Sequence, residues 1–325
     1  MSRTRLIGKG LWLGLVALAL AGLAFAWVLT GSSTIAKETS FTIPAGASVS
    51  SVADKLEAEG LISSAAGFVL QARIFGSDAP IQAGEFLLTP GMSQGEILAA
   101  FQSGDVIRRF VTIPEGMPSI LVWERLMAEP LLTGDVPVPP EGSILPDTYA
   151  FERGQSRASL VQQMQSAMDN ALAEEWAKRS PRIAVDTMRD ALILAAIVEK
   201  ETGKPEERRM VAGLYSNRVR TGMKLQADPT IIYPVTKGKP LGRRIRQSEI
   251  AAVNGYNTYT RVGLPEGPIT NPGRDSIAAV MNPENTGALF MVADGTGGHW
   301  FASTLEEHNA NVAKWYAIRR ERGEM

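Results

Sequence analysis

Glu199 and Glu201 stand in the segment ILAAIVEKETG, residues 193–203, directly after six uncharged apolar residues. If this segment is a helix, at least one of the two acids lies at the edge of a buried surface, where an ionised carboxylate is costly. Burial raises the pKa of a carboxyl group, so such a group can stay protonated near neutral pH. Cleavage of a glycosidic bond uses a protonated carboxyl, because an acid must protonate the leaving oxygen.

The helical period does not decide which of the two acids has this role. It puts Glu199 on the same helix face as Leu192, Ala195 and Ala196. It puts Glu201 on the same face as Leu194, Ile197 and Val198. From the residues alone, a salt-bridged helix end is the simpler explanation of both acids.

Other catalytic patterns are missing. The chain has no Cys and only two His, which excludes a thiol nucleophile and disfavours a His-rich metal centre. It contains no Walker loop, no G-x-S-x-G elbow and no H-E-x-x-H motif. The glycine-rich segment DGTGGH, residues 294–299, is expected to be a hairpin turn and not a phosphate-binding loop. A structural role is the simpler expectation for His299, and contact with substrate is the alternative.

The elements around the two acids can be placed from caps and breakers. Asp186 or Thr187 is expected to cap a helix that runs through Glu201 and stops at Gly203. The sequence further predicts helices over 156–179 and from Pro205 to about 220, strands over 230–235 and 288–294, and a last helix opened by the capping box at residues 304–307. The body is therefore expected to be α+β.

The N-terminus predicts a membrane anchor. Residues 11–29 carry no charge and form about 28 Å of helix, against a bilayer core of about 30 Å. Three basic residues precede this span, which predicts a cytoplasmic tail over 1–10 and a single-pass inner-membrane protein whose body is periplasmic or otherwise extracytoplasmic. The alternative is a signal peptide cleaved after the Ala24-Phe25-Ala26 sequence.

Charge argues against nucleic acid as a partner. The chain has 33 basic and 34 acidic residues, and removing the three basic residues of the tail leaves 30 against 34, a net charge of −4. Generic nucleic-acid binding needs a strong positive excess, which this chain does not have.

One phrase recurs along the chain. FTIPAGASVSSVADKLEAEGLI, residues 41–62, is echoed at residues 111–132 and more loosely at 87–101. Each copy is a short β-prone piece, a Pro-Gly or Pro-x-Gly turn and an amphipathic helix. A strand, two helices and a strand over residues 36–108 resemble a LysM-type module, and the alternative is an α+β spacer that carries a catalytic domain at 109–325 away from the membrane.

Five motifs together resemble the endolytic murein transglycosylase (YceG-like) family. They are EGSILPDTYAF (141–151), IVEKET (197–202), NRVRTGMKLQADPTIIY (217–233), YNTYTRVGLPEGPITNPG (256–273) and FMVADGTGGHWFASTLEEHN (290–309). The resemblance implies that the first acid of E-K-E-T, Glu199, protonates the β-1,4 oxygen between N-acetylmuramic acid and N-acetylglucosamine. The same carboxylate then acts as base on the muramoyl C6 hydroxyl, which closes a 1,6-anhydro ring without water or a cofactor.

The resemblance also implies a set of substrate-binding residues. Two groups are expected to contact glycan: Gln226, Asp228 and Thr230 in LQADPT, and Asn257, Thr258 and Tyr259 in YNTY. Asp228 is further expected to stabilise positive charge on the sugar ring. Glu201 is assigned to helix-end pairing. The basic run KGKPLGRRIR, residues 237–246, is expected to be an exposed loop, and contact with acidic murein stems is the alternative.

The partners expected on this basis are peptidoglycan strands, the membrane and the cell-wall synthesis machinery. Two other functions remain open at this stage. One is a non-catalytic murein-binding scaffold, in which Glu199 is dispensable. The other is a glycoside hydrolase that uses water and leaves a reducing end.

Overall fold

The computed structural model describes residues 16, 19, 22, 33–77 and 79–324. The chain divides into two compact units, residues 1–109 and 110–325. Nearly all of the anchor predicted at 11–29 lies outside the described residues. Within the described residues, no helix is long and apolar enough to cross a membrane.

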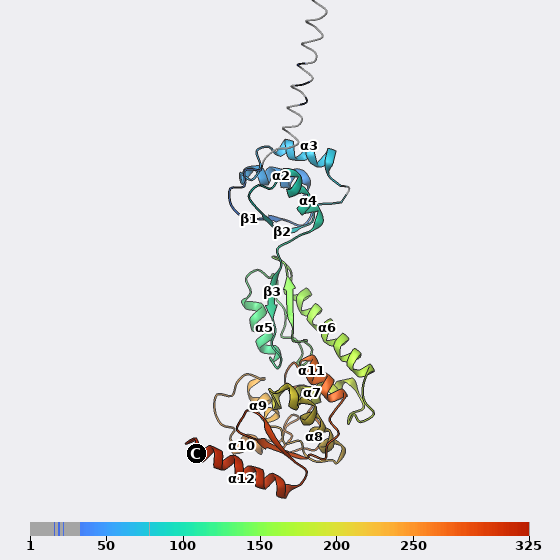
Figure 1. The fold of residues 1–325 in the computed structure, drawn as a ribbon, viewed down its shortest axis with the longest axis vertical. Coiled ribbons are helices and arrows are strands. Elements are labelled where there is room, and N and C mark those ends of the chain that lie inside the picture. The colour runs from blue at the N-terminus through green and yellow to red at the C-terminus, as the bar shows by residue number, and fades with distance from the viewer. Residues whose placement is uncertain (1–15, 17–18, 20–21, 23–32, 78, 325) are drawn as a thin grey trace, which may run out of the picture. The chain divides into compact units, whose positions relative to one another are not determined.

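The first unit is a small α+β module. Its elements are β1 (Thr39–Ile43), α2 (Val49–Ala58), α3 (Ala65–Phe75), β2 (Gly84–Leu88) and α4 (Gln94–Ser103), labelled in Figure 1. β1 and β2 pair antiparallel with Phe41 opposite Phe86, and the Phe101 ring of α4 contacts both of these rings. The strand, helix, helix, strand order expected from the sequence is confirmed, and α4 extends it.

The recurring phrase is a repeated local structure. In each copy a strand leads into a turn and then a helix: β1 into α2, β2 into α4, and β3 (Arg109–Thr112) into α5 (Ser119–Ala128). Each turn contains a glycine with positive φ: Gly46 at 77°, Gly91 at 86° and Gly116 at 69°. Since side chains rarely adopt this conformation, the glycine explains why the phrase keeps its Pro-Gly or Pro-x-Gly core.

The second unit begins with a strand pair. β3 pairs with β4 (Thr148–Phe151), and α5 and α6 (Arg157–Ala177) supply buried apolar side chains to the same core. Ser156 caps α6 by accepting a hydrogen bond from Ser159, as expected for the helix predicted at 156–179.

A buried helix forms the centre of the second unit. α7 (Met188–Glu201) is capped by Thr187, and its residues from Ile193 to Val198 are all buried. It packs against α6, α8 (Arg208–Arg220), α9 (Pro229–Thr236) and α11 (Arg274–Met281). A helix covered on every side is apolar all round, which explains the run ILAAIV and why periodicity gave no single face. The short η1 (Pro205–Glu207) and α10 (Gln247–Ile250) complete this part.

The strand predicted at 230–235 is wrong, because this segment is the helix α9. Its Ile and Tyr residues favour a strand locally. Pro229 instead occupies the first turn of a helix, where its missing N–H is not needed. The Thr230 hydroxyl donates to the carbonyl of Ala227 at 2.7 Å, and Ile231 and Tyr233 are buried. Tertiary packing therefore overrides local propensity here.

The chain closes with a hairpin and a helix. β5 (Phe290–Ala293) and β6 (His299–Ala302) pair antiparallel, so the DGTGGH segment is the hairpin turn that the sequence predicted. α12 (Leu305–Glu321) packs on both strands and opens with the predicted capping box of Thr304 and Glu307.

Candidate active site

A pocket of about 360 Å³ opens beside the C-terminal end of α7. This volume lies within the usual range of small-molecule sites, about 300–1,000 Å³. Its polar lining comes from α7, α8 and the segments at 226–228 and 259: Lys200, Glu201, Tyr215, Arg218, Gln226, Asp228 and Tyr259. Three of the six predicted glycan contacts, Gln226, Asp228 and Tyr259, therefore lie around one cavity together with Glu201.

Glu201 is the acid that faces this pocket. Its Oε1 atom is buried and has no hydrogen-bond partner. Burial, and secondarily the charge of Asp228, raises the pKa of Glu201 to about 7, against the opposing effects of a Tyr215 hydrogen bond and the charge of Arg218. The assignment of Glu201 to an exposed, paired helix end is wrong, because the pocket walls remove its carboxyl from water. A buried acid with a perturbed pKa in a cleft marks a candidate catalytic group.

Glu199 is hydrogen-bonded to the start of α11 and not exposed to the pocket. Its Oε2 accepts hydrogen bonds from the Gly273 N–H at 3.0 Å and from the Ser276 hydroxyl at 2.7 Å. Gly273 is the N-cap of α11 and Ser276 lies in its first turn, so the Glu199 side chain ties the end of α7 to the start of α11. Glu199 does not line the pocket. The geometry thus separates two acids that the sequence could not.

Asp228 and Tyr259 form a hydrogen-bonded pair in the lining of the pocket. The Tyr259 hydroxyl donates to Asp228 Oδ1 at 2.6 Å. Burial, and then the hydrogen bond to Asp228, raise the pKa of the Tyr259 phenol above its usual value, so it remains a donor. Asp228 precedes Pro229 at the start of α9, and its charge acts on Glu201 across the cavity.

Gln226 reaches the pocket from an unusual backbone conformation. Its φ of 51° is in the left-handed region, which only two non-glycine residues of the described chain adopt. Its N–H donates to the Thr258 carbonyl at 3.2 Å. Strain of this kind is tolerated where surrounding contacts fix the backbone, and here it brings residues 226–228 to the cavity.

The other three predicted glycan contacts are buried. Thr230, Asn257 and Thr258 have no exposed surface. The hydroxyls of Thr230 and Thr258 are 2.8 Å apart, and Thr258 also accepts from the Ala227 N–H at 3.0 Å. The Asn257 amide donates to the carbonyls of Ile250 and Ala252 at 3.0 and 2.7 Å. Their burial does not favour the predicted contact with glycan, and their hydrogen bonds join the segments that carry the pocket residues.

The lining residues that were not predicted from the sequence include two polar residues of α8. Tyr215 and Arg218 lie three residues apart on α8 and share one face of it. Arg218 donates to the carbonyls of Leu289 at 2.7 Å and Leu225 at 2.5 Å, so it also ties α8 to the loops around the pocket. Two polar residues at this spacing on an otherwise buried helix are the signal that would have indicated them.

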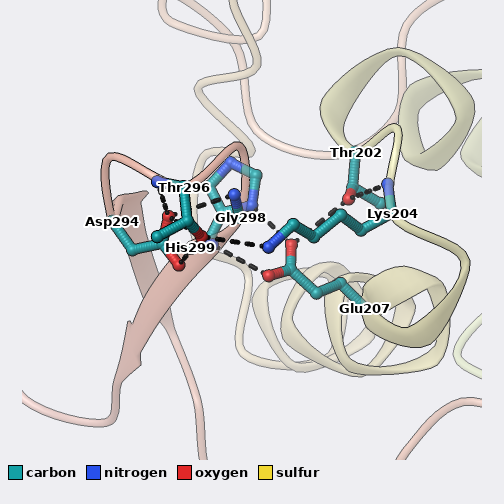
Figure 2. A network of polar contacts seen from close by, with 7 residues as sticks. All are labelled: Thr202, Lys204, Glu207, Asp294, Thr296, Gly298 and His299. Carbon is teal, nitrogen blue, oxygen red and sulfur yellow. Dashed lines mark hydrogen bonds and ion pairs between the residues drawn. The ribbon is translucent and has the colours of Figure 1, made fainter.

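A polar network holds the end of α7 against the β5–β6 hairpin, as Figure 2 shows. Thr202, the residue after Glu201, donates from its hydroxyl to Glu207 Oε2 at 3.2 Å. Glu207 also accepts from the His299 N–H at 2.9 Å and contacts His299 Nδ1 at 2.8 Å. Lys204 Nζ donates to the Thr296 hydroxyl at 3.1 Å. His299 is thus structural, as expected, and does not line the pocket.

The family model described as the YceG-like family matches residues 41–314. The chain belongs to the YceG-like family. Within the described residues, no group of three or more His, Asp or Glu side chains is arranged to hold a metal ion.

Three curated relatives of this YceG-like chain share one protein name. Two proteins named endolytic murein transglycosylase, from Streptococcus pneumoniae strains D39 and R6, are 29% identical over 322 residues. These matches cover 84% of this chain and 57% of the relatives, so the chain spans little more than half of their length. The Bacillus subtilis protein of the same name is 27% identical over 312 residues, covering 86% of this chain and 85% of that protein.

A solved structure has a similar fold. The 2.6 Å crystal structure of a YceG-like protein from Listeria monocytogenes superposes with a TM-score of 0.53 at 27% identity, over 84% of this chain and 98% of that one.

Proposed function

We propose that this chain is an endolytic murein transglycosylase that cleaves the β-1,4 bond after N-acetylmuramic acid, with Glu201 as its general acid and base. The observation that carries the proposal is the position of Glu201, buried in a pocket with its pKa raised to about 7. Relatives that bear this enzyme name and membership of the YceG-like family support the substrate class.

The chemistry follows from the two carboxyl groups. Near pH 7 a substantial fraction of Glu201 is protonated, so it can donate a proton to the glycosidic oxygen as the bond breaks. The ionised Glu201 then takes the proton of the muramoyl C6 hydroxyl, whose oxygen attacks C1 and closes the anhydro ring. Asp228, held by Tyr259, supplies negative charge that stabilises the developing oxocarbenium ion.

Glu201 replaces Glu199 as the proposed acid. Glu199 Oε2 accepts two hydrogen bonds at the N-terminus of α11, and Glu199 does not line the pocket. A general acid needs a site in the pocket where its charged form is disfavoured. Glu201 has that environment, because one of its buried oxygens is unpaired.

One observation favours a second candidate, a murein hydrolase that uses water. Glycoside hydrolases employ a pair of carboxyl groups, and Glu201 and Asp228 line one cavity. In that case Asp228 activates water or attacks the sugar, and the product has a reducing end.

Mass spectrometry of the products from purified murein separates these candidates. The proposal expects 1,6-anhydro-muramoyl ends from the wild-type chain and no new ends from Glu201→Gln. Reducing ends alone would favour the hydrolase. Undiminished activity of Glu201→Gln would remove Glu201 from the mechanism, and binding without any cleavage by the wild type would favour a scaffold.

Localisation is part of the proposal. The uncharged span at 11–29 and its basic flank support a retained inner-membrane anchor with the catalytic unit outside the cytoplasm. The first unit supports a LysM-like role in glycan positioning by its β1-α2-α3-β2 order. Protease added to intact spheroplasts should digest the body, and a mature N-terminus at Trp27 would show that the span is a cleaved signal instead.

A further inference from the structure

A second cavity lies next to the catalytic pocket. Its volume is about 350 Å³. The two cavities share three lining residues, Lys200, Pro229 and Ile232, so the end of α7 and the first turn of α9 form the wall between them. A ligand that fills the catalytic pocket can therefore extend into the second cavity without leaving the surface.

The second cavity has the wrong chemistry for a sugar ring. Its lining is largely apolar and includes Ile232, Leu241 and Ile269. The Tyr233 hydroxyl is already hydrogen-bonded with Glu141 and Tyr256, so it is not free to bind a sugar hydroxyl. Glycans need many hydrogen-bond partners for their hydroxyl groups, and buried hydroxyls without partners are costly.

The other polar side chains that line the second cavity are positively charged. Lys200 and Lys239 both line the second cavity. Lys239 is paired with Glu124, which leaves Lys200 as the lysine whose ammonium has no hydrogen bond or ion pair among the described residues. An apolar wall beside an unpaired ammonium group fits a ligand that alternates small apolar groups and carboxylates.

We propose that this cavity binds the acidic peptide stem of the muramoyl residue at the cleaved bond. The proposal rests on the proposed function, because a stem reaches this cavity only if the muramoyl ring lies in the catalytic pocket. Such a stem carries methyl groups suited to Ile232 and Leu241, and carboxylates suited to Lys200. Lys239 can exchange Glu124 for a stem carboxylate at little cost, because both members of this ion pair are partly exposed.

A binding experiment tests the cavity without turnover. Full-length Glu201→Gln protein is titrated by calorimetry with the free tripeptide L-Ala-γ-D-Glu-diaminopimelate. Adding Lys200→Ala is expected to weaken binding about fivefold, the upper value for a partly exposed ion pair. Adding Leu241→Asp should weaken it more, since it introduces a like charge into an apolar wall. Lys314→Ala, on the exposed face of α12, is the matched control and should leave binding unchanged. Absence of binding, or binding that neither cavity substitution weakens, overturns the proposal.

An activity experiment separates this proposal from the proposed function. kcat/KM of the wild type is measured on murein strands with stems and on the same strands stripped by an amidase. We expect a higher value on the stem-bearing strands, and Leu241→Asp should bring the ratio of the two values toward one. Equal values for the wild type contradict stem binding and leave the transglycosylase proposal standing. Failure to cleave either strand contradicts the transglycosylase proposal, and the peptide titration then decides the role of the cavity.

Discussion

The Tyr259 hydroxyl donates a 2.6 Å hydrogen bond to Asp228 on the wall of the pocket that Glu201 lines. This bond fixes the carboxylate whose charge helps to keep Glu201 protonated. Tyr259→Phe retains the ring and removes the bond. A hydrogen bond to a charged group contributes about 1.5–3 kcal/mol, so we expect turnover to fall by roughly tenfold or more. Tyr316→Phe, an exposed tyrosine of α12, is the control, and full activity of Tyr259→Phe would show that Asp228 needs no such support.

The raised pKa of Glu201 predicts a specific pH dependence. Its protonated form is the acid, so the rate should fall as pH rises through about 7. A pH profile of kcat on purified murein measures this limb. Asp228→Asn removes the second cause of the raised pKa, so its limb should move to lower pH. A rate that stays constant from pH 6 to pH 8.5 would contradict the assignment.

The same group affects stability in a defined direction. Between the unfolded pKa near 4.5 and the folded pKa near 7, the folded chain binds more protons at Glu201 than the unfolded chain. Stability therefore falls as pH rises through this window. Glu201→Gln removes the penalty, and we expect it to stabilise the protein by about 1–3 kcal/mol at pH 8 and little at pH 4. Denaturant unfolding at the two pH values checks this. A Glu201→Gln variant that is less stable than the wild type at pH 8 would contradict the claim that burial penalises the ionised Glu201.

Glu199 is expected to matter for stability more than for chemistry. Glu199→Ala leaves the Gly273 N–H and the Ser276 hydroxyl without their acceptor. A typical hydrogen bond contributes about 0.5–1.5 kcal/mol, so losing both should cost roughly 1–3 kcal/mol. Thermal unfolding measures this loss, and a double-mutant cycle with Ser276→Ala should show coupling between the two side chains. Additive effects would mean that the Glu199–Ser276 contact contributes nothing.

The network of Figure 2 predicts a positioning role for Glu207. Glu207→Ala removes its contacts to Thr202 and His299, and Thr202 directly follows Glu201. We expect kcat to fall about tenfold with little change in KM, because a shifted acid loses geometry and not substrate contacts. The pH limb assigned to Glu201 should also move. Glu206→Ala, at the exposed neighbouring position, is the control, and equal kcat values for the two variants would assign Glu207 to structure alone.

Local signals in the sequence were sufficient for much of this fold. Thr187 was one of the two caps expected for α7, and the capping box at Thr304 opened the last helix as expected. Such features act over three or four residues, so they can be read without tertiary structure. The helix at 229–236 could not be predicted in this way, because its Ile-Ile-Tyr segment favours a strand until packing is considered.

The candidate site, too, could be predicted only in part from local sequence signals. The motifs singled out Gln226, Asp228 and Tyr259, and these three side chains line one pocket. The choice between Glu199 and Glu201 depended on two distant groups. The N-terminus of α11, 74 residues away in sequence, satisfies Glu199, and the charge of Asp228 acts on Glu201. Periodicity carries no information on either contact.

The central claim is that Glu201, and not Glu199, is the catalytic acid. The most direct measurement is the rate of anhydro-muropeptide release from purified murein by Glu201→Gln and Glu199→Gln, with circular dichroism as the control for folding. General acid–base catalysis contributes about a hundred- to ten-thousand-fold, so Glu201→Gln should lose at least that much while remaining folded. Glu199→Gln should keep activity within a few-fold of the wild type at temperatures where it is folded. An active Glu201→Gln beside a folded, inactive Glu199→Gln would contradict the account.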